Sequence, residues 1–473
     1  MLFSTKVFIF LFLPLVLFCY YLLKQNRILQ NIFLTCASLV FYAYGEPYFV
    51  LVMIASIIAN WSFGLLVDKF HESKWKAVTT IVAMLVFNLG ILGVFKYLMF
   101  ILGNVNSLFG SAIPIPHIVL PIGISFFTFQ AISYVLDVYR GRAVAQRNPL
   151  DVGLYISIFP ALIAGPIVRY ETIAEQIHHR KETIDDFSEG VCRFIVGLSK
   201  KMLIANSLAW TADSAFELSA GELSVTMAWL GAVAYTLQIY FDFSGYSDMA
   251  IGLGKMFGFH FLENFRYPYS SLSISDFWRR WHISLSSWFR DYVYFPLGGN
   301  RVKTAAHLIF NLFVVWALTG LWHGANWTFV CWGLFYFVLL VFEKFTNFEK
   351  RFASPMLIPL RWAYTMLFVI VGWVLFRASD ISSALTYLHT MFGLSGAPLF
   401  DDRAYFHIHE NRYFFLFGIM FSFPVAAWLE KKLEEKKSLV GEIAGSAVYV
   451  SLLFVSVCYV IKGSYNPFIY FNF

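Results

Sequence analysis

The sequence predicts an all-α, polytopic transmembrane helical protein, and three features of its composition support this. Of its 473 residues, 59% are hydrophobic and only 14% are charged, whereas a soluble domain carries about 25% charged residues. Aromatic side chains make up 20% of the chain, and the mean hydropathy is +0.65. This composition cannot cover a water-exposed surface, so it excludes an ordinary cytosolic enzyme, a disordered chain and a nucleic-acid-binding domain.

Long apolar runs define the predicted spans, since crossing a bilayer takes about 20 mostly apolar residues. We predict about 11–12 spanning helices, together with re-entrant and interfacial helices. Lys6 precedes the first run, which ends without a small-x-small cleavage site, so we expect a retained helix and no removed signal peptide. The candidate spans are 7–23, 28–44, 48–67, 77–101, 116–138, 191–212, 226–259, 305–322, 327–343, 359–376, 412–428 and 441–461.

Lysine and arginine alternate between the links that join the first spans. The links at 24–27, 69–76 and 140–147 are basic, whereas those at 46–47 and 103–116 contain neither residue. Because basic links stay in the cytoplasm, this pattern predicts a cytoplasmic location for the basic links and an outside N-terminus. It also explains the net charge of +6 without a nucleic-acid partner.

The apolar segment 150–168 breaks this alternation. Pro160, Gly165 and Pro166 interrupt it, and the connector that follows is again basic, with Arg169 at its start. A full crossing would place that connector outside. We therefore predict a re-entrant segment that enters the membrane and returns, because broken backbone is tolerated at depth when protein surrounds it.

His323 is the strongest candidate for a chemical role. It lies in LTGLWHGANW (318–327), between two long apolar runs. An ionisable side chain in such a position costs about 2.5–3.5 kcal/mol on insertion scales, which makes it a functional candidate by default. Burial favours the neutral imidazole, which can act as a general base toward a hydroxyl group. The alternative is a histidine that is hydrogen-bonded to a neighbouring helix.

The second candidate is the segment 276–291, DFWRRWHISLSSWFRD, which is rich in tryptophan and arginine. Arg279 and Arg280 supply positive charge, and Asp276 can pair with either of them along a helix. The functional interpretation is a cytoplasmic anion site, because guanidinium groups bind phosphate oxygens well. The alternative is a helix anchored at the membrane surface. We predict one continuous helix, with one face formed by Trp278, Trp281, His282 and Leu285.

Two further polar groups of residues carry weaker signals. Asp242 and Asp248 interrupt an apolar span, but their spacing of six keeps them off one helical face and argues against a catalytic pair. We expect either a polar network that lines a cavity or pairing with arginines of the basic loop 260–303. The tract His407–Glu410 lies in an exposed link without defined further ligands, and the five cysteines have no paired spacing. We therefore predict no metal site.

The same residues resemble a known family. The string DFWRRWHISLSSWFRDYVYFPLGGNR (276–301) resembles the signature of the membrane-bound O-acyltransferase (MBOAT) family, and His323 resembles that family's intramembrane histidine. The tracts at 126–141, 159–170 and 238–252 are similar to its bacterial, alginate O-acetyltransferase-like branch. The resemblance implies an MBOAT-like fold formed by a single membrane-embedded domain over residues 1–473, with its core signature at 116–345.

The resemblance also implies acyl transfer inside the membrane. Cytoplasmic acetyl-CoA would donate the acetyl group, and His323 would act as general base or carry the group transiently. His282 matches the second histidine of the family and would assist or position. Arg279 and Arg280 would lie near the nucleotide end of coenzyme A.

By the same resemblance, the protein would work in the bacterial inner membrane as the O-acetyltransferase component of a two-component system. It would need a periplasmic esterase-like acetyltransferase partner and a polysaccharide acceptor such as alginate, another exopolysaccharide or peptidoglycan. A close alternative is D-alanyl transfer to teichoic acid. An alternative of another class is a secondary transporter of a sugar or lipid-linked intermediate, which would also explain broken segments.

Overall fold

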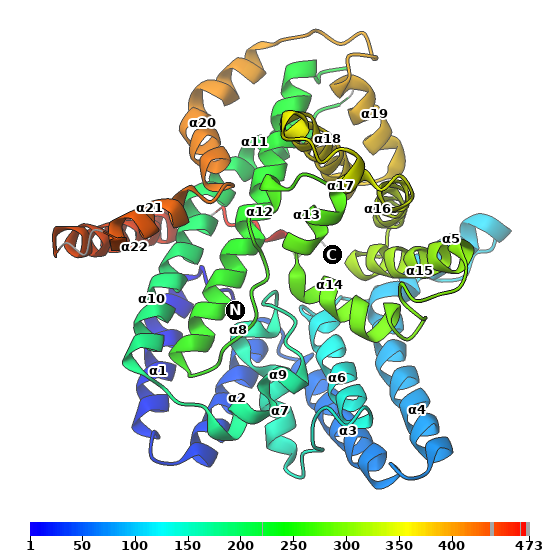
Figure 1. Cartoon of the computed structure of the whole chain (residues 1–473), viewed down its shortest axis with the longest axis vertical. Helices are drawn as coiled ribbons and strands as arrows, with labels where there is room; N and C mark the ends of the chain where they lie inside the picture. The colour runs from blue at the N-terminus through cyan, green and yellow to red at the C-terminus, as the bar shows by residue number, and fades with distance from the viewer. Residues whose placement is uncertain (220, 436–438, 464, 470–473) are drawn as a thin grey trace. The chain divides into compact units, whose positions relative to one another are not determined.

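The computed structural model describes residues 1–219, 221–435, 439–463 and 465–469. Within this part of the chain, all regular secondary structure is helical (Figure 1), which confirms the predicted fold class. Each predicted span overlaps one or more of the helices. Among the described residues, the helical segments that are long and apolar enough to cross a membrane are Arg27–Gly45, Val50–Lys69, Lys74–Phe109, Ala305–His323, Trp327–Phe345, Pro355–Arg377 and Ile443–Lys462.

The chain divides into two compact units, of which unit 1 comprises Met1–Phe194 and Ser247–Leu262. Its helices are η1 (Phe8–Phe12), α1 (Leu13–Leu22), α2 (Arg27–Gly45), α3 (Val50–Lys69), α4 (Lys74–Leu92), η2 (Gly93–Tyr97), α5 (Leu98–Phe109), α6 (Ile124–Tyr139), α7 (Pro149–Ser157), α8 (Phe159–Leu162), α9 (Tyr170–His179) and most of α10 (Ile184–Ser199).

The predicted re-entrant segment is broken near its middle. Helix α7 ends at Ser157, Ile158 leaves the helical conformation with φ −50° and ψ 109°, and α8 begins at Phe159. Pro160 occupies the first turn of α8, where its missing N–H leaves no hydrogen bond unmade. All residues from 151 to 168 are buried. Protein therefore surrounds the broken backbone, as a re-entrant segment requires, and the side of the membrane to which it returns stays a prediction.

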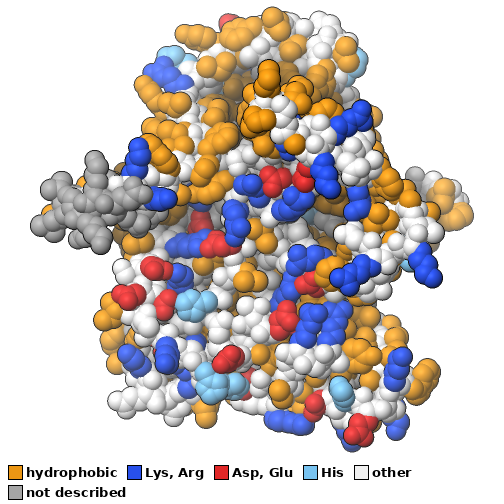
Figure 2. Space-filling view, in the orientation of Figure 1, with side chains coloured by type: hydrophobic (Ala, Val, Ile, Leu, Met, Phe, Trp, Pro, Cys, Tyr) orange, Lys and Arg blue, Asp and Glu red, His pale blue; other side chains and the backbone are white. Residues whose placement is uncertain are grey.

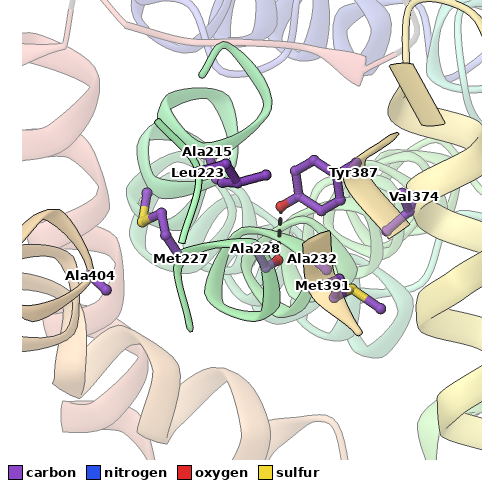
Figure 3. Packing of buried hydrophobic residues seen from close by; sticks show 9 residues of the cluster. All are labelled: Ala215, Leu223, Met227, Ala228, Ala232, Val374, Tyr387, Met391 and Ala404. Atoms are coloured by element: carbon purple, nitrogen blue, oxygen red, sulfur yellow. Dashed lines mark hydrogen bonds between the residues drawn. The ribbon is translucent and has the colours of Figure 1, made fainter. Parts of the chain in front are cut away.

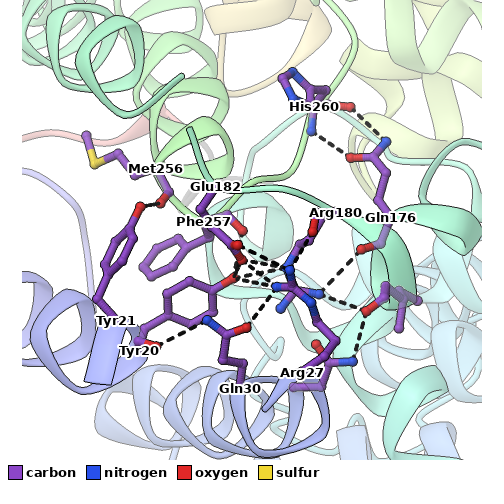
Figure 4. Close-up of polar contacts among 12 residues, drawn as sticks. Tyr20, Tyr21, Arg27, Gln30, Gln176, Arg180, Glu182, Met256, Phe257 and His260 are labelled. Carbon is purple, nitrogen blue, oxygen red and sulfur yellow. Dashed lines mark hydrogen bonds and ion pairs between the residues drawn. The ribbon is translucent and has the colours of Figure 1, made fainter. Parts of the chain in front are cut away.

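A polar network holds unit 1 together at one end of α1 (Figure 4). The carboxylate of Glu182 pairs with Arg27, the first residue of α2, and lies 2.5 Å from the hydroxyl of Tyr20. Arg180 donates to the same hydroxyl over 3.0 Å and to the carbonyl of Ile177 over 2.9 Å. The network thus connects α1, α2 and the C-terminal end of α9.

Unit 2 comprises Ile195–Tyr246 and Glu263–Phe473. Its helices are η3 (Lys200–Ala205), α11 (Asn206–Phe216), most of α12 (Val225–Met256), η4 (Pro268–Ser270), α13 (Ile274–Arg280), α14 (Ile283–Phe289), η5 (Arg290–Tyr294), α15 (Ala305–His323), α16 (Trp327–Phe345), α17 (Phe348–Arg351), η6 (Pro355–Leu357), α18 (Ile358–Arg377), α19 (Ile381–Met391), α20 (Asp402–Phe421), α21 (Val425–Glu435) and α22 (Leu439–Lys462).

A buried cluster packs α11, α12, α18, α19 and α20 of unit 2 against one another (Figure 3). Several of its members are alanines, whose small side chains let helix backbones approach closely. Tyr387 of α19 donates a hydrogen bond of 2.8 Å to the carbonyl of Ala228, and its ring stacks on Phe216 with centroids 4.3 Å apart. The cluster therefore holds these five helices of unit 2 together.

Candidate active site

His323 is the last residue of α15, the first helix of the hairpin formed by α15 and α16. Gly320 and Gly333 set the close packing of this hairpin. A Cβ on Gly320 would collide with the carbonyl oxygen of Phe329, and one on Gly333 would collide with that of Trp316. Glycine is therefore needed at both contacts, and the contacts fix the end of α15 against α16.

Aromatic rings surround His323. Its imidazole is 5.0 Å from the ring of Trp332 and 5.2 Å from that of Phe376, nearly perpendicular to each, and Trp322 lies 5.0 Å away. The residue is 6% exposed. An imidazole among apolar rings loses most of the solvation that its charged form needs. The predicted burial of His323 is therefore confirmed, whereas its chemical role stays a prediction.

The prediction of one continuous helix over 276–291 is wrong. Helix α13 ends at Arg280, Trp281 is extended, and His282 has φ 44°, in the left-handed region that non-glycine residues rarely adopt. The alternative hydrogen bonds come from Asn264, whose backbone carbonyl accepts from the N–H of Ile283 over 3.0 Å. These long-range contacts override the helical periodicity, and the single face predicted for this segment is divided between α13 and α14.

His282 is completely enclosed, with 1% of its surface exposed. Its Nδ1 atom lies 3.1 Å from the side-chain oxygen of Asn264. The ring of Phe243, from α12, meets the imidazole at a right angle with centroids 4.6 Å apart. Burial lowers the pKa of His282 to about 3, because the charged imidazolium would be deprived of water.

The structure brings the two predicted histidines to a common neighbour. The centroid of the Trp322 ring lies 6.0 Å from that of His282, with an angle of 64° between the ring planes, and 5.0 Å from that of His323, with an angle of 82°. The long apolar spans thus hold one histidine, the α13–α14 turn holds the other, and one indole contacts both. This grouping of residues separated by about 40 positions is the candidate active site.

The two predicted arginines lie at the surface instead. Arg279 pairs with Glu349 over 3.2 Å, and Arg280 pairs with Asp276 over 3.1 Å, so the expected support from Asp276 goes to Arg280. Figure 2 shows Lys and Arg side chains gathered over the part of the face where α13 and α14 lie. The Arg279 side chain is 62% exposed and the Arg280 side chain is 35% exposed, so both reach solvent.

The start of α13 is held by a residue that the sequence analysis missed. Glu343 of α16 is 4% exposed and accepts hydrogen bonds from the backbone N–H groups of Ile274 and Ser275 over 2.6 and 2.8 Å. A carboxylate near a helix N-terminus satisfies donors that have no partner within the helix. The only sequence signal was one acidic residue at the end of an apolar run.

Asp242 and Asp248 pair with cations from neighbouring helical segments. Asp242 lies 2.6 Å from Lys201 of η3, and both side chains are buried, while Asp248 pairs with Arg193 of α10 over 2.9 Å. The two carboxylates have separate partners, as expected for residues on different faces. The expected partners were arginines of the loop 260–303, however, whereas Lys201 and Arg193 lie on η3 and α10. Lys96, buried within η2 and bonded to Ser125 over 3.3 Å, is a further ionisable residue that the sequence analysis passed over.

Among the described residues, no three histidine, cysteine, aspartate or glutamate side chains are grouped so that they could hold a metal. The tract His407–Glu410 was expected in an exposed link, but it lies within α20, and His407 is buried. Nδ1 of His407 contacts the hydroxyl of Thr211 over 3.2 Å. His409 lies 3.8 Å from Glu410.

Comparison with known proteins identifies the family that this chain resembles. The model of the membrane-bound O-acyltransferase family matches residues 145–389. The chain is 46% identical over 406 residues to a probable alginate O-acetylase of Azotobacter vinelandii, covering 85% of this chain and 80% of that protein. It is 41% identical to the corresponding Pseudomonas putida protein over 100% of both chains. It is 34% identical to the peptidoglycan O-acetyltransferase of Helicobacter pylori, over 100% of this chain and 98% of that protein.

Proposed function

The chain belongs to the membrane-bound O-acyltransferase family, and on that basis we propose that it moves an acetyl group from cytoplasmic acetyl-CoA across the membrane toward a polysaccharide of the envelope or secreted by the cell. It is an acyltransferase and a multi-pass membrane protein. The relatives named for alginate and peptidoglycan O-acetylation support a hydroxyl-bearing polysaccharide as the final acceptor.

We propose His323 as the general base of this reaction. The observation that carries the proposal is a buried imidazole enclosed by Trp322, Trp332 and Phe376 at the end of a tightly packed hairpin. In that position a neutral imidazole nitrogen accepts the proton of the hydroxyl group that receives the acetyl group. The hydroxyl oxygen bonds to the thioester carbonyl carbon at the same time. The carbon–sulfur bond then breaks, the carbonyl re-forms, and the thiolate leaves and takes up the proton.

The acyl donor and the final transfer to the sugar involve further groups. Arg279 and Arg280 are proposed to bind the phosphates of coenzyme A, which the exposure of both guanidinium groups supports. We propose that the whole chain forms one membrane-embedded domain in the bacterial inner membrane. A separate periplasmic, esterase-like transferase is proposed to place the acetyl group on the sugar.

A single-turnover assay tests the function. We expect protein in nanodiscs with radiolabelled acetyl-CoA and the periplasmic transferase to lose thioester, and His323→Ala to abolish that loss. Label retained on the protein would mark an acetyl-histidine, whereas label found only on the acceptor would mark direct transfer.

The matched control is His407→Asn, because His407 is also 6% exposed but lies on α20. This variant is expected to keep transfer at the wild-type rate. Near-normal transfer by a folded His323→Ala protein would exclude the catalytic role. Absence of thioester loss in the wild type would instead point to another acyl donor, such as a carrier-bound D-alanyl group.

A further inference from the structure

The buried turn between α13 and α14 is organised around one amide side chain. We propose that Asn264 holds His282 in the tautomer with its proton on Nδ1, so that Nε2 accepts a hydrogen bond from an N–H or O–H group of a substrate. Asn264 then acts as a positioning residue through His282. The substrate part of this inference rests on the proposed acyl transfer, whereas the tautomer does not.

The orientation of the Asn264 amide follows from an obligate donor. The backbone N–H of Ser284 lies 3.2 Å from Oδ1 of Asn264, and the Ser284 hydroxyl lies 2.8 Å from the same atom. A backbone N–H can only donate, so the atom that faces it must be the amide oxygen. Nδ1 of His282, 3.1 Å from that oxygen, must therefore carry the proton. A neutral imidazole has one proton, and Nε2 is left with its lone pair.

The backbone fixes the same arrangement. Asn264 is fully buried, and its carbonyl oxygen accepts from the N–H of Ile283 over 3.0 Å. His282 keeps a left-handed φ of 44°, a strained conformation for a non-glycine residue that persists only where the surroundings hold it. The contacts of Asn264 stabilise this conformation, which a continuous helix would not contain. Strain of this kind is common at functional sites.

Nε2 of His282 is buried, and within the described part of the chain it has no hydrogen-bond partner. A buried polar atom without a hydrogen-bond partner is unfavourable, and a hydrogen bond donated by the substrate would remove that cost. Phe243 of α12, Ser284 of α14 and Trp322 of α15 meet the imidazole, and none of these three is charged. His282 therefore stays neutral at working pH, in agreement with its lowered pKa.

This arrangement decides what His282 can do. A bare Nε2 cannot donate to the carbonyl oxygen of the acyl group, so it does not stabilise the developing oxyanion. It can orient a donor: an amide N–H on the pantetheine arm of the acyl donor, or the hydroxyl of the acceptor. Proton transfer is then left to His323, and both residues share Trp322 as a neighbour.

The tautomer is measured directly by ¹⁵N NMR of histidine-labelled protein in nanodiscs. The His282 signals are identified by their loss in His282→Gln. We expect a protonated Nδ1 and an unprotonated Nε2, unchanged between pH 5 and 8. A protonated Nε2 would overturn the proposal. This readout needs no substrate, so it remains decisive even if the acyl donor is not acetyl-CoA.

Two substitutions of Asn264 test the link to activity. Asn264→Leu removes the acceptor, and we expect it to slow acyl transfer at least tenfold at every pH. Asn264→Asp keeps an acceptor oxygen but adds a negative charge, which raises the pKa of His282. Its activity should exceed that of the leucine variant at pH 8 and fall on acidification, because Nε2 becomes protonated and can no longer accept. Wild-type rates and pH profiles in both variants would contradict the proposal.

Kinetics identify the donor group, and Ser287→Ala is the matched control. Ser287 lies on α14 and donates to the carbonyl of Ser284 over 2.9 Å, so this variant should keep the wild-type pH profile. A raised KM for acetyl-CoA in Asn264→Asp at pH 6 indicates the pantetheine amide. A raised KM for the acceptor indicates the hydroxyl. Unchanged values of both would overturn the role assigned to Nε2.

Discussion

At the scale of single residues, the exposed arginines of α13 give a quantitative test of acyl-donor binding. Arg279 and Arg280 pair with different carboxylates, so neither is essential to the other's position. Replacing both with glutamine should raise the KM for acetyl-CoA about tenfold or more, because charge-assisted hydrogen bonds contribute about 1.5–3 kcal/mol each. The turnover of bound donor should change little.

The double substitution of Lys350 and Arg351 by glutamine is the control for this experiment. These two residues form the basic last turn of α17. Their substitution removes the same formal charge as that of Arg279 and Arg280. An equal rise in KM in this control would assign the effect to the general electrostatic field. An unchanged KM in the Arg279 and Arg280 variant would show that those two residues only anchor α13 at the membrane surface.

The sequence predicted individual residues well where their chemistry is local. His323 is buried, and the Asp276–Arg280 pair is four residues apart, as its helical spacing requires. Asn264 and Glu343 were missed because their partners are 18 and 69 positions away in the chain. An asparagine or glutamate has no periodic signature of its own, so only the folded contacts reveal its role.

At the scale of helices, the α15–α16 hairpin should be intolerant of side chains at its contact points. Gly333→Ala would place a Cβ on the carbonyl oxygen of Trp316, and overpacking of this kind costs about 1–3 kcal/mol. We expect a lower Tm and reduced acyl transfer, because the helices must move apart beside His323.

Gly90→Ala on α4 is the matched control for the hairpin. No atom lies within 4 Å of a Cβ built at this glycine, so the substitution should leave the Tm unchanged or raise it, since alanine is the better helix former. Equal Tm values for the Gly333→Ala protein and the wild type would show that the hairpin is not tightly packed.

The network around Glu182 predicts a pH dependence for unit 1. Burial alone would raise the pKa of Glu182, but hydrogen bonds from Arg27 and Tyr20 outweigh it and lower the pKa below its usual 4.5. A lowered native pKa contributes stability above the unfolded value, and this is lost as the pH falls through the native value. The Tm should therefore fall below about pH 4.5.

Glu182→Gln should have a lower Tm at pH 7, because Arg27 and Arg180 lose their counter-charge, and should lose less on acidification than the wild type. Differential scanning fluorimetry in detergent between pH 3 and 7 measures both effects. Parallel Tm curves for the two proteins would exclude this carboxylate as the source of the acid sensitivity.

Helix boundaries were harder to predict than helix content. The predicted span 116–138 starts as helix only at Ile124, because Pro114, Pro116 and Pro121 cannot donate to a helical ladder. The break at His282 had no such marker, since neither proline nor glycine occurs between 276 and 291. The prolines therefore mark the start of the helix at Ile124 in the sequence itself, whereas the break at His282 depends on tertiary contacts.

At the scale of the whole molecule, composition was enough to predict an all-helical membrane protein, because so few charged residues cannot solvate a surface. The direction of each crossing depends on the segment 150–168. If it returns to the side from which it entered, its flanking links face the same compartment, and every later helix keeps its predicted orientation. A full crossing would invert them all.

Cysteine labelling decides between these two cases. In a protein without its five native cysteines, Val144→Cys and Lys181→Cys occupy exposed links on either side of the segment. We expect both to react with a membrane-impermeant maleimide from the cytoplasmic side, together with Glu72→Cys, whereas Ala112→Cys should react only from outside. The physical reason is that the basic links resist translocation, while α7 and α8 can enter the membrane only because protein surrounds their break. Labelling of Lys181→Cys from the outside alone would show that 150–168 crosses completely, and the basic loop that carries Arg279 and Arg280 would then face away from cytoplasmic acetyl-CoA.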